Sequence, residues 1–278
     1  MGGQEEKIHP IGVIDSGVGG LTVVQELQRV LPNEALLYFG DNANCPYGNR
    51  SEAEILELTH AMLRRMQQAE VKLVVVACNT ISALISQYAG MYPFPIVGII
   101  EPAVRQLIQS GARRAGLFAT AFTVASNCYQ DMVHALNPQV ELVAVPSLKL
   151  AALVDSGKYE GPEVEAEVED LLAQMRKSCG EEGLPQKIIL GCTHYPIVEQ
   201  VFREKAPLGT EFINPAVAQA ETVRRLLVSR GVMEPAQSKG QSKCGKLWIE
   251  TSGDASVYAP MIQHLALRAE SIGQKYIE

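Results

Sequence analysis

The sequence of 278 residues has six cysteines but no C-x-x-C pair. Closely spaced cysteine pairs are typical of structural zinc sites, and disulfide frameworks are typical of small secreted domains. The first ten residues, MGGQEEKIHP, are polar and acidic and do not resemble a signal peptide. We therefore expect free thiols, no structural metal, a loose N-terminal tail and a cytoplasmic location.

An excess of positive charge is also missing. Lysine and arginine total 24 against 31 aspartates and glutamates, which gives a formal net charge of −7. Proteins that bind nucleic acid present a basic surface, so no nucleic-acid partner is expected. No uninterrupted apolar run approaches the roughly 20 residues that a membrane-spanning helix needs, so no membrane partner is expected either.

Apolar runs alternate with amphipathic segments along the chain, which is typical of an α/β fold with mainly parallel sheets flanked by helices. The strands are predicted at 8–14, 35–39, 71–77, 96–100, 114–119, 140–145, 187–191, 211–213 and 246–251. The helices are predicted at 20–31, 51–69, 80–90, 101–110, 122–136, 147–155, 162–178, 197–205 and 215–230. The low-complexity segment 234–246 is predicted to be a surface linker.

Two of the predicted strands end in a similar way, in LVVVACNT (73–80) and in IILGCTHYP (188–196). This duplication favours two pseudo-symmetric α/β domains with a cleft between them. We expect residues 1–99 and 211–278 to form the first, discontinuous domain and residues 100–210 to form the second.

Ligands of parallel sheets bind at the carboxyl ends of the strands, where both cysteine segments should lie. Cys78 is predicted at a helix start, where backbone N–H groups favour a thiolate, and Asp15 is a suitable acid–base partner for it. Cys192 is followed by His194, which could hold or share its proton. One buried cysteine is commonly a packing residue, but two matched thiols with such partners indicate chemistry.

Inversion of a stereocentre needs one acid and one base on opposite faces, and their roles exchange in the reverse direction. A thiol and a thiolate meet this requirement. Donors from Asn79, Thr80 and Thr193 could hold the α-carboxylate of an amino acid as negative charge develops on it.

A cofactor is not expected. The glycine-rich segment SGVGG (16–20) matches neither the dinucleotide fingerprint G-x-G-x-x-G nor the P-loop. Its glycines more simply allow a tight turn and a close approach of the backbone to a small anionic ligand. No lysine lies in a setting that suggests a Schiff base with pyridoxal phosphate.

The segments IGVIDSGVGGLTV, PYGNRS, ACNT, GCTHYP and TSGD, spread from residue 11 to 254, resemble the motif set of glutamate racemases in the cofactor-independent aspartate/glutamate racemase superfamily. The resemblance implies an isomerase with its active site between two α/β domains, which interconverts L- and D-glutamate and supplies D-glutamate for peptidoglycan in the bacterial cell wall. It implies that Cys78, assisted by Asp15, handles the α-proton of D-glutamate, and that Cys192, assisted by His194, handles that of L-glutamate. The substrate-binding residues that it implies are Asp15, Ser16, Tyr47, Gly48, Asn79, Thr80, Thr120, Thr193 and His194.

Two departures from the family pattern stand out. Ala119 precedes Thr120 where the family often has glycine, and LVDSG places Asp155 where the family commonly has a helper glutamate. Asp155 is one methylene shorter, so its auxiliary role is left open. Cys45, in the loop before Pro46, is interpreted as a neutral loop residue, and Cys128, Cys179 and Cys244 are interpreted in the same way.

Several alternatives remain open at this point. The substrate could be aspartate or another acidic amino acid, because the sequence does not reveal the size of a pocket. A thiol hydrolase would use Cys192 and His194 as nucleophile and base but would leave Cys78 without a role. A zinc site could be built from Cys78, Cys192, His194 and Asp15. A non-catalytic amino-acid-binding protein would not need matched thiols, and the sequence does not decide whether the protein is a homodimer.

Overall fold

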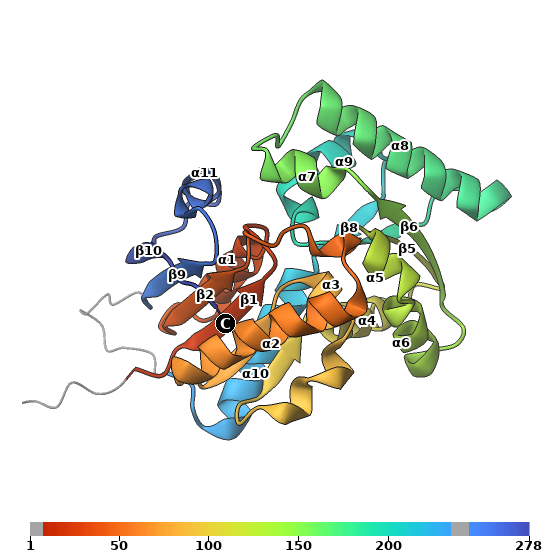
Figure 1. Ribbon diagram of the computed structural model, residues 1–278. Helices are drawn as coiled ribbons and strands as arrows, with labels where there is room; N and C mark the ends of the chain where they lie inside the picture. Colours follow the sequence, from red (N-terminus) through yellow and green to blue (C-terminus); the bar gives the residue numbers. More distant parts are fainter. Residues whose placement is uncertain (1–7, 235–244, 278) are drawn as a thin grey trace, which may run out of the picture.

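The computed structural model describes residues 8–234 and 245–277, and it confirms the predicted α/β class. One sheet has six strands in the order β10-β9-β2-β1-β3-β4, and the other has four in the order β6-β5-β7-β8 (Figure 1). We call each sheet with its flanking helices a lobe, the six-stranded one being the first lobe. The strands are β1 Ile11–Asp15, β2 Leu36–Gly40, β3 Leu73–Val76, β4 Ile96–Gly98, β5 Arg114–Thr120, β6 Glu141–Ser147, β7 Lys187–Gly191, β8 Glu211–Ile213, β9 Leu247–Thr251 and β10 Ser271–Gln274.

Helices connect the strands and flank both sheets (Figure 1). The α-helices are α1 Leu21–Val30, α2 Glu52–Gln68, α3 Asn79–Ser82, α4 Ile100–Gln109, α5 Ala121–Ala125, α6 Cys128–Leu136, α7 Leu150–Asp155, α8 Pro162–Cys179, α9 Glu199–Lys205, α10 Pro215–Arg230 and α11 Tyr258–His264. Short 3₁₀ turns include η1 Tyr47–Asn49 and η5 Tyr195–Val198. No helix among the described residues is long and apolar enough to cross a membrane.

Local sequence signals account for where several helices begin. Ser51 accepts a hydrogen bond from the backbone N–H of Glu54, and the Glu54 side chain accepts one from the N–H of Ser51, so the predicted capping box is present. Asn214 accepts a hydrogen bond from the N–H of Ala216 at the start of α10, as expected for an N-cap before proline.

The structure departs from the sequence prediction in three places. The helix predicted over 122–136 is divided into α5 and α6, because Asn127 adopts a left-handed conformation with φ of 55°. The helix predicted over 80–90 is α3 followed by two 3₁₀ turns. β10 is exposed and α11 contains a proline, so neither has the hydrophobic periodicity that would predict it. Residues 235–244, most of the predicted linker, lie outside the described residues.

Every strand pairing in both sheets is parallel. Asp15 at the end of β1 is opposite Gly40 of β2, and Ile14 is opposite Val76 of β3. In the second sheet Gly191 of β7 is opposite Ala119 of β5. The carboxyl ends of β1, β2 and β3 therefore share one edge, and those of β5 and β7 share another.

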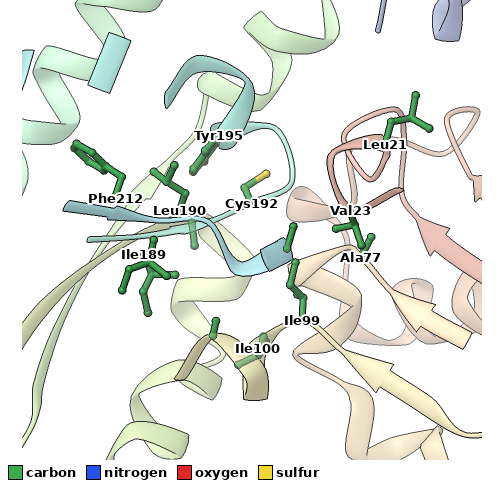
Figure 2. Packing of buried hydrophobic residues seen from close by; sticks show 14 of the residues in the cluster. Leu21, Val23, Ala77, Ile99, Ile100, Ile189, Leu190, Cys192, Tyr195 and Phe212 are labelled. Atoms are coloured by element: carbon green, nitrogen blue, oxygen red, sulfur yellow. The ribbon is translucent and has the colours of Figure 1, made fainter. Parts of the chain in front are cut away.

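A continuous hydrophobic cluster joins the two lobes. It includes Leu21 and Ala77 of the first lobe together with Leu190 and Cys192 of the second. Figure 2 shows these side chains on either side of the boundary between the lobes, with the sulfur of Cys192 directed toward the first lobe. Because this cluster spans the boundary, it holds the loops after β1, β3 and β7 close together in the arrangement that the structure shows.

The domain limits of the sequence prediction stay a proposal, and one strand bears on them. β8 forms its ladder with β7, with Ile188 opposite Phe212, so residues 211–213 belong to the four-stranded sheet. The return to the first lobe thus follows residue 213, a few residues later than the predicted boundary.

The carboxyl edge of the first sheet tolerates no additional atom at Gly40. A Cβ there would lie 2.5 Å from the carbonyl oxygen of Gly17 and still closer to the hydroxyl of Tyr258. We expect Gly40→Ala to lower the free energy of unfolding by about 1–3 kcal/mol, since neither the backbone nor a buried tyrosine can move freely. Gly90→Ala is the matched control, because a Cβ there meets nothing within 4 Å. Denaturant unfolding of both variants tests this, and equal stabilities would contradict it.

Candidate active site

A cavity of about 30 Å³ lies between the carboxyl edges of the two sheets. From the first lobe it is lined by the loops after β1, β2 and β3, and from the second by the ends of β5, α7 and β7. Its lining residues are Ser16, Cys45, Pro46, Tyr47, Gly48, Cys78, Asn79, Thr80, Thr120, Ala151, Asp155, Cys192, Thr193 and His194. Of the site residues predicted from the sequence, all but Asp15 are in this lining.

Cys78 follows β3 and is the N-cap residue of α3. Its thiol lies 3.5 Å from the hydroxyl of Ser16, to which it donates a hydrogen bond. Burial, with a further contribution from the nearby Asp15 carboxylate, raises the pKa of Cys78 to about 12. Cys78 is therefore a proton-bearing thiol in this arrangement, rather than the ready thiolate that its helix-start position predicted.

Asp15 lies one layer behind the cavity wall and is fully buried. One of its carboxylate oxygens accepts a hydrogen bond from the N–H of Gly17 at 3.0 Å, and the other accepts one from the hydroxyl of Thr193 at 3.4 Å. Burial raises the pKa of Asp15 to about 6, against the opposing effect of His194. Asp15 can therefore change protonation state near neutral pH, which a general acid–base partner requires.

Cys192 follows β7 and is the first member of a chain of three polar side chains. Its sulfur lies 3.5 Å from Nδ1 of His194, and Nε2 of His194 lies 2.8 Å from a carboxylate oxygen of Asp155. Burial alone would lower the pKa of His194, but the Asp155 carboxylate holds it well above its usual value. Burial opposes ionisation of Asp155 too, yet His194 keeps the net pKa of Asp155 low. The pair is thus an imidazolium and a carboxylate.

Asn79 and Thr80 begin α3 on the wall beside Cys78. The Asn79 carbonyl oxygen accepts a hydrogen bond of 2.7 Å from the hydroxyl of Tyr129, while its amide nitrogen is buried without a partner. The hydroxyls of Thr80 and Thr120 are 3.1 Å apart, and that of Thr123 is within 3.5 Å of both. These side chains present donors to the cavity from both lobes.

The loop after β2 closes the cavity on another side. The hydroxyl of Tyr47 donates a hydrogen bond of 2.5 Å to Asp41, which also accepts one from Ser252 in the TSGD segment. Gly48 faces Thr120 of the second lobe so closely that a Cβ would lie 3.0 Å from it. The PYGNRS and TSGD segments are therefore connected in space through Asp41.

Three residues with a hydroxyl or thiol group at or behind the cavity wall were not predicted as site residues, and neither were the apolar lining residues Pro46 and Ala151. Cys45, interpreted as a neutral loop residue, lines the cavity, and its sulfur lies 3.9 Å from Asp155. Tyr129 and Thr123 lie behind Asn79 and Thr80. Neither Tyr129 nor Thr123 directly follows a strand, so the expectation that ligands bind at the carboxyl ends of strands could not identify them. Cys45 could have been identified, because it belongs to the turn-rich segment NCPYG.

The four side chains considered as a zinc site do not form one here. Among the described residues no group of three or more His, Cys, Asp or Glu side chains is arranged to hold a metal ion. The histidine nitrogens face Cys192 and Asp155 instead.

Comparison with known proteins defines the class. Residues 11–223 match the family model described as Asp/Glu/hydantoin racemase, which covers most of the chain and every cavity residue. The chain therefore belongs to the Asp/Glu/hydantoin racemase family, whose racemases are isomerases.

Within that family, several relatives are named as glutamate racemases. The chain is 41% identical over 218 residues to the glutamate racemase of Trichormus variabilis, covering 77% of this chain and 72% of that one. It is 34% identical over 272 residues to the glutamate racemase of Shouchella clausii, covering 97% and 95%. Among solved structures, a glutamate racemase isoform from Bacillus anthracis matches with a TM-score of 0.87 at 29% identity, covering 98% of both chains. The glutamate racemase of Francisella tularensis in complex with D-glutamate matches with a TM-score of 0.85 at 27% identity, also over 98% of both.

The raised pKa of Asp15 has a consequence for stability. Below pH 3.8 the carboxyl is protonated in both the folded and unfolded states; between 3.8 and about 6 it ionises only in the unfolded state, so stability falls as the pH rises. The loss is complete above about pH 6 and amounts to roughly 3 kcal/mol. We expect Asp15→Asn to gain stability relative to the native protein by up to that amount between pH 4 and pH 7, measured by urea unfolding. Parallel pH profiles would contradict this.

Proposed function

We propose that this protein is a glutamate racemase, which interconverts L- and D-glutamate by transferring protons between the α-carbon and two cysteines, without a cofactor. The observation that carries the proposal is that Cys78 and Cys192 line one cavity from different lobes, each with its own acid–base partner. The relatives and solved neighbours named as glutamate racemases support the choice of substrate.

In the L-to-D direction, Cys192 removes the α-proton of L-glutamate and Cys78 delivers its thiol proton to the opposite face. The protonated state of Cys78 suits the second step, because a thiol with a raised pKa keeps its proton until the carbanion forms. In the reverse direction Cys78 must act as the base. Asp15 assists in that direction by accepting the thiol proton. The Asp15 carboxylate is then neutral, so its negative charge no longer disfavours the thiolate of Cys78.

Asp155 takes the position of the family's helper glutamate. Although its side chain is one methylene shorter, its carboxylate reaches Nε2 of His194 at 2.8 Å, because α7 ends at Asp155 on the rim of the cavity. This contact fixes the ring and directs Nδ1 toward Cys192, where a protonated imidazole can return a proton to sulfur or stabilise its negative charge. Asp155 thus acts through His194 rather than on the substrate.

The amides and hydroxyls around the cavity hold the substrate. We assign Asn79, Thr80 and Thr193 to the α-carboxylate, whose charge grows as the α-proton leaves. Ser16, Tyr47, Gly48 and Thr120 complete the surroundings. The cavity of about 30 Å³ has room for about two water molecules, far less than glutamate occupies, so the lobes must separate for the substrate to enter. Closure afterwards excludes water from the carbanion.

Three further statements belong to the same proposal. The D-glutamate produced would serve peptidoglycan synthesis, and thus cell shape, in a bacterial cytoplasm. The homodimer stays an open prediction. Aspartate remains the alternative substrate, and comparison of the initial rates of racemisation of the two amino acids decides between them.

A thiol hydrolase is the alternative of another class, and the Cys192–His194–Asp155 chain favours it to some extent. It gives no role to Cys78 or to Asp15. Trapping of an acyl group on Cys192 with an activated ester, followed by mass spectrometry, would support it.

Replacement of either thiol tests the two-base mechanism. We expect Cys78→Ala and Cys192→Ala each to lower kcat for racemisation at least about 100-fold in both directions, because every turnover uses both groups. Cys179→Ala is the control, since this cysteine is buried at the end of α8 away from the cavity. Circular dichroism of the amino acid follows the reaction, and substantial racemisation by either of the first two variants would refute the mechanism.

The origin of the incorporated proton gives a second test. When L-glutamate is racemised in deuterated water with no added cofactor, α-deuterium should appear first in the D-product, while the remaining L-substrate stays protonated. The reason is that the thiol delivering to the second face has exchanged with solvent, whereas the base has just taken the substrate's own proton. Chiral separation with mass spectrometry measures both pools. Equal early labelling of the two would indicate a single shared base.

A further inference from the structure

The Asn79 side chain is buried at the cavity wall with one end satisfied and the other end free. It is 2% exposed, its carbonyl oxygen receives the Tyr129 hydroxyl at 2.7 Å, and its amide nitrogen has no hydrogen-bond partner. A buried donor without a partner is costly, and such groups in native proteins commonly serve a ligand. Asn79 is one of the residues that line the cavity together with both thiols.

An asparagine amide has almost the same shape when it is rotated by half a turn. A tyrosine hydroxyl can donate to the oxygen end or accept from the nitrogen end; here it donates to the oxygen, which leaves the NH₂ group as the unpaired end. A carbonyl oxygen turned into the cavity would repel a carboxylate, whereas the NH₂ group attracts it. The orientation of this one amide thus determines whether Asn79 helps or hinders the binding of an anion.

Tyr129 is well placed to set that orientation. It lies on α6 of the second lobe, it is fully buried in the cluster that spans the lobes, and its hydroxyl donates across the boundary to α3 of the first lobe. Burial raises the pKa of Tyr129 well above its usual value, so the hydroxyl keeps the proton that it donates.

We propose that Tyr129 is a positioning residue, whose hydroxyl holds the Asn79 carbonyl oxygen so that the amide NH₂ group faces the substrate's α-carboxylate. This inference rests on the proposed function, since it supposes a carboxylate in the cavity. Tyr129 does not border the cavity itself and acts only through Asn79. Because the carboxylate gains negative charge as the α-proton leaves, a fixed donor stabilises the transition state as well as the bound substrate.

The test is a double-mutant cycle with Tyr129→Phe and Asn79→Ala. We expect Tyr129→Phe alone to lower kcat/KM for glutamate about tenfold, the effect of losing one well-aligned hydrogen bond. In the Asn79→Ala background the same change should have less than a twofold effect, because the residue through which Tyr129 acts is gone. Equal effects in both backgrounds, or an unchanged kcat/KM in Tyr129→Phe, would overturn the proposal.

Tyr88→Phe is the matched control. Tyr88 is also fully buried, and its hydroxyl donates a hydrogen bond of 3.0 Å to the backbone oxygen of Ile81, outside the cavity. Both variants should lose similar thermal stability, but only Tyr129→Phe should lose kcat/KM. A parallel loss in Tyr88→Phe would show that the effect of Tyr129 is structural.

A readout in the native protein does not depend on the folding of any Tyr129 variant. The side-chain NH₂ resonance of ¹⁵N-labelled Asn79, assigned by its disappearance in Asn79→Ala, should shift when D-glutamate is added. An unmoved resonance on a protein that racemises glutamate would overturn the role of Asn79, and with it that of Tyr129. If the native protein neither racemises nor binds glutamate, the proposed function itself fails, and that outcome is distinct from the others.

Discussion

The parallel pairing of strands is the constraint on which the rest of the structure depends. Parallel strands all end at the same edge, so residues that follow β1, β2 and β3 converge without any contact between them in the sequence. The second sheet does the same for β5 and β7, and a shared hydrophobic cluster brings the two edges face to face. Residues as far apart as Ser16 and Cys192 therefore border one small cavity.

Burial of this cavity has opposite electrostatic effects on its two sides. Among the residues that the structure describes, no positive side chain is in hydrogen-bond contact with Cys78. Burial therefore keeps this thiol protonated, and it also raises the pKa of Asp15 to about 6. Near Cys192 the same burial strengthens the attraction between His194 and Asp155, which keeps both of them charged. One side of the cavity thus carries a neutral proton donor, Cys78, and the other carries the oppositely charged pair of His194 and Asp155.

The sequence was sufficient for those parts of the site that follow a strand directly. Cys78 and Cys192 could be identified because a short β-branched run predicts a buried strand, and the strand fixes where the next residue points. Tyr129 could not be identified, since it lies on a helix and reaches Asn79 only through the way the lobes pack. The same holds for the contact between Asp155 and His194, whose distance depends on where α7 ends. β10 and α11 lacked a hydrophobic period, so their places in the fold depend on tertiary contacts alone.

The two sides of the cavity are chemically unlike, with a carboxyl group behind one thiol and an imidazolium–carboxylate pair behind the other. Mirror-image amino acids, however, have identical free energies in water, so the equilibrium constant of the proposed reaction is unity whatever the catalyst. Thermodynamics then requires the ratio kcat/KM to be the same for both enantiomers. The asymmetry of the site can therefore appear only in the separate values of kcat and KM, which can differ between the two enantiomers while their ratio stays the same. An enzyme built in this way can therefore respond differently to accumulating L- and D-amino acid, although it favours neither at equilibrium.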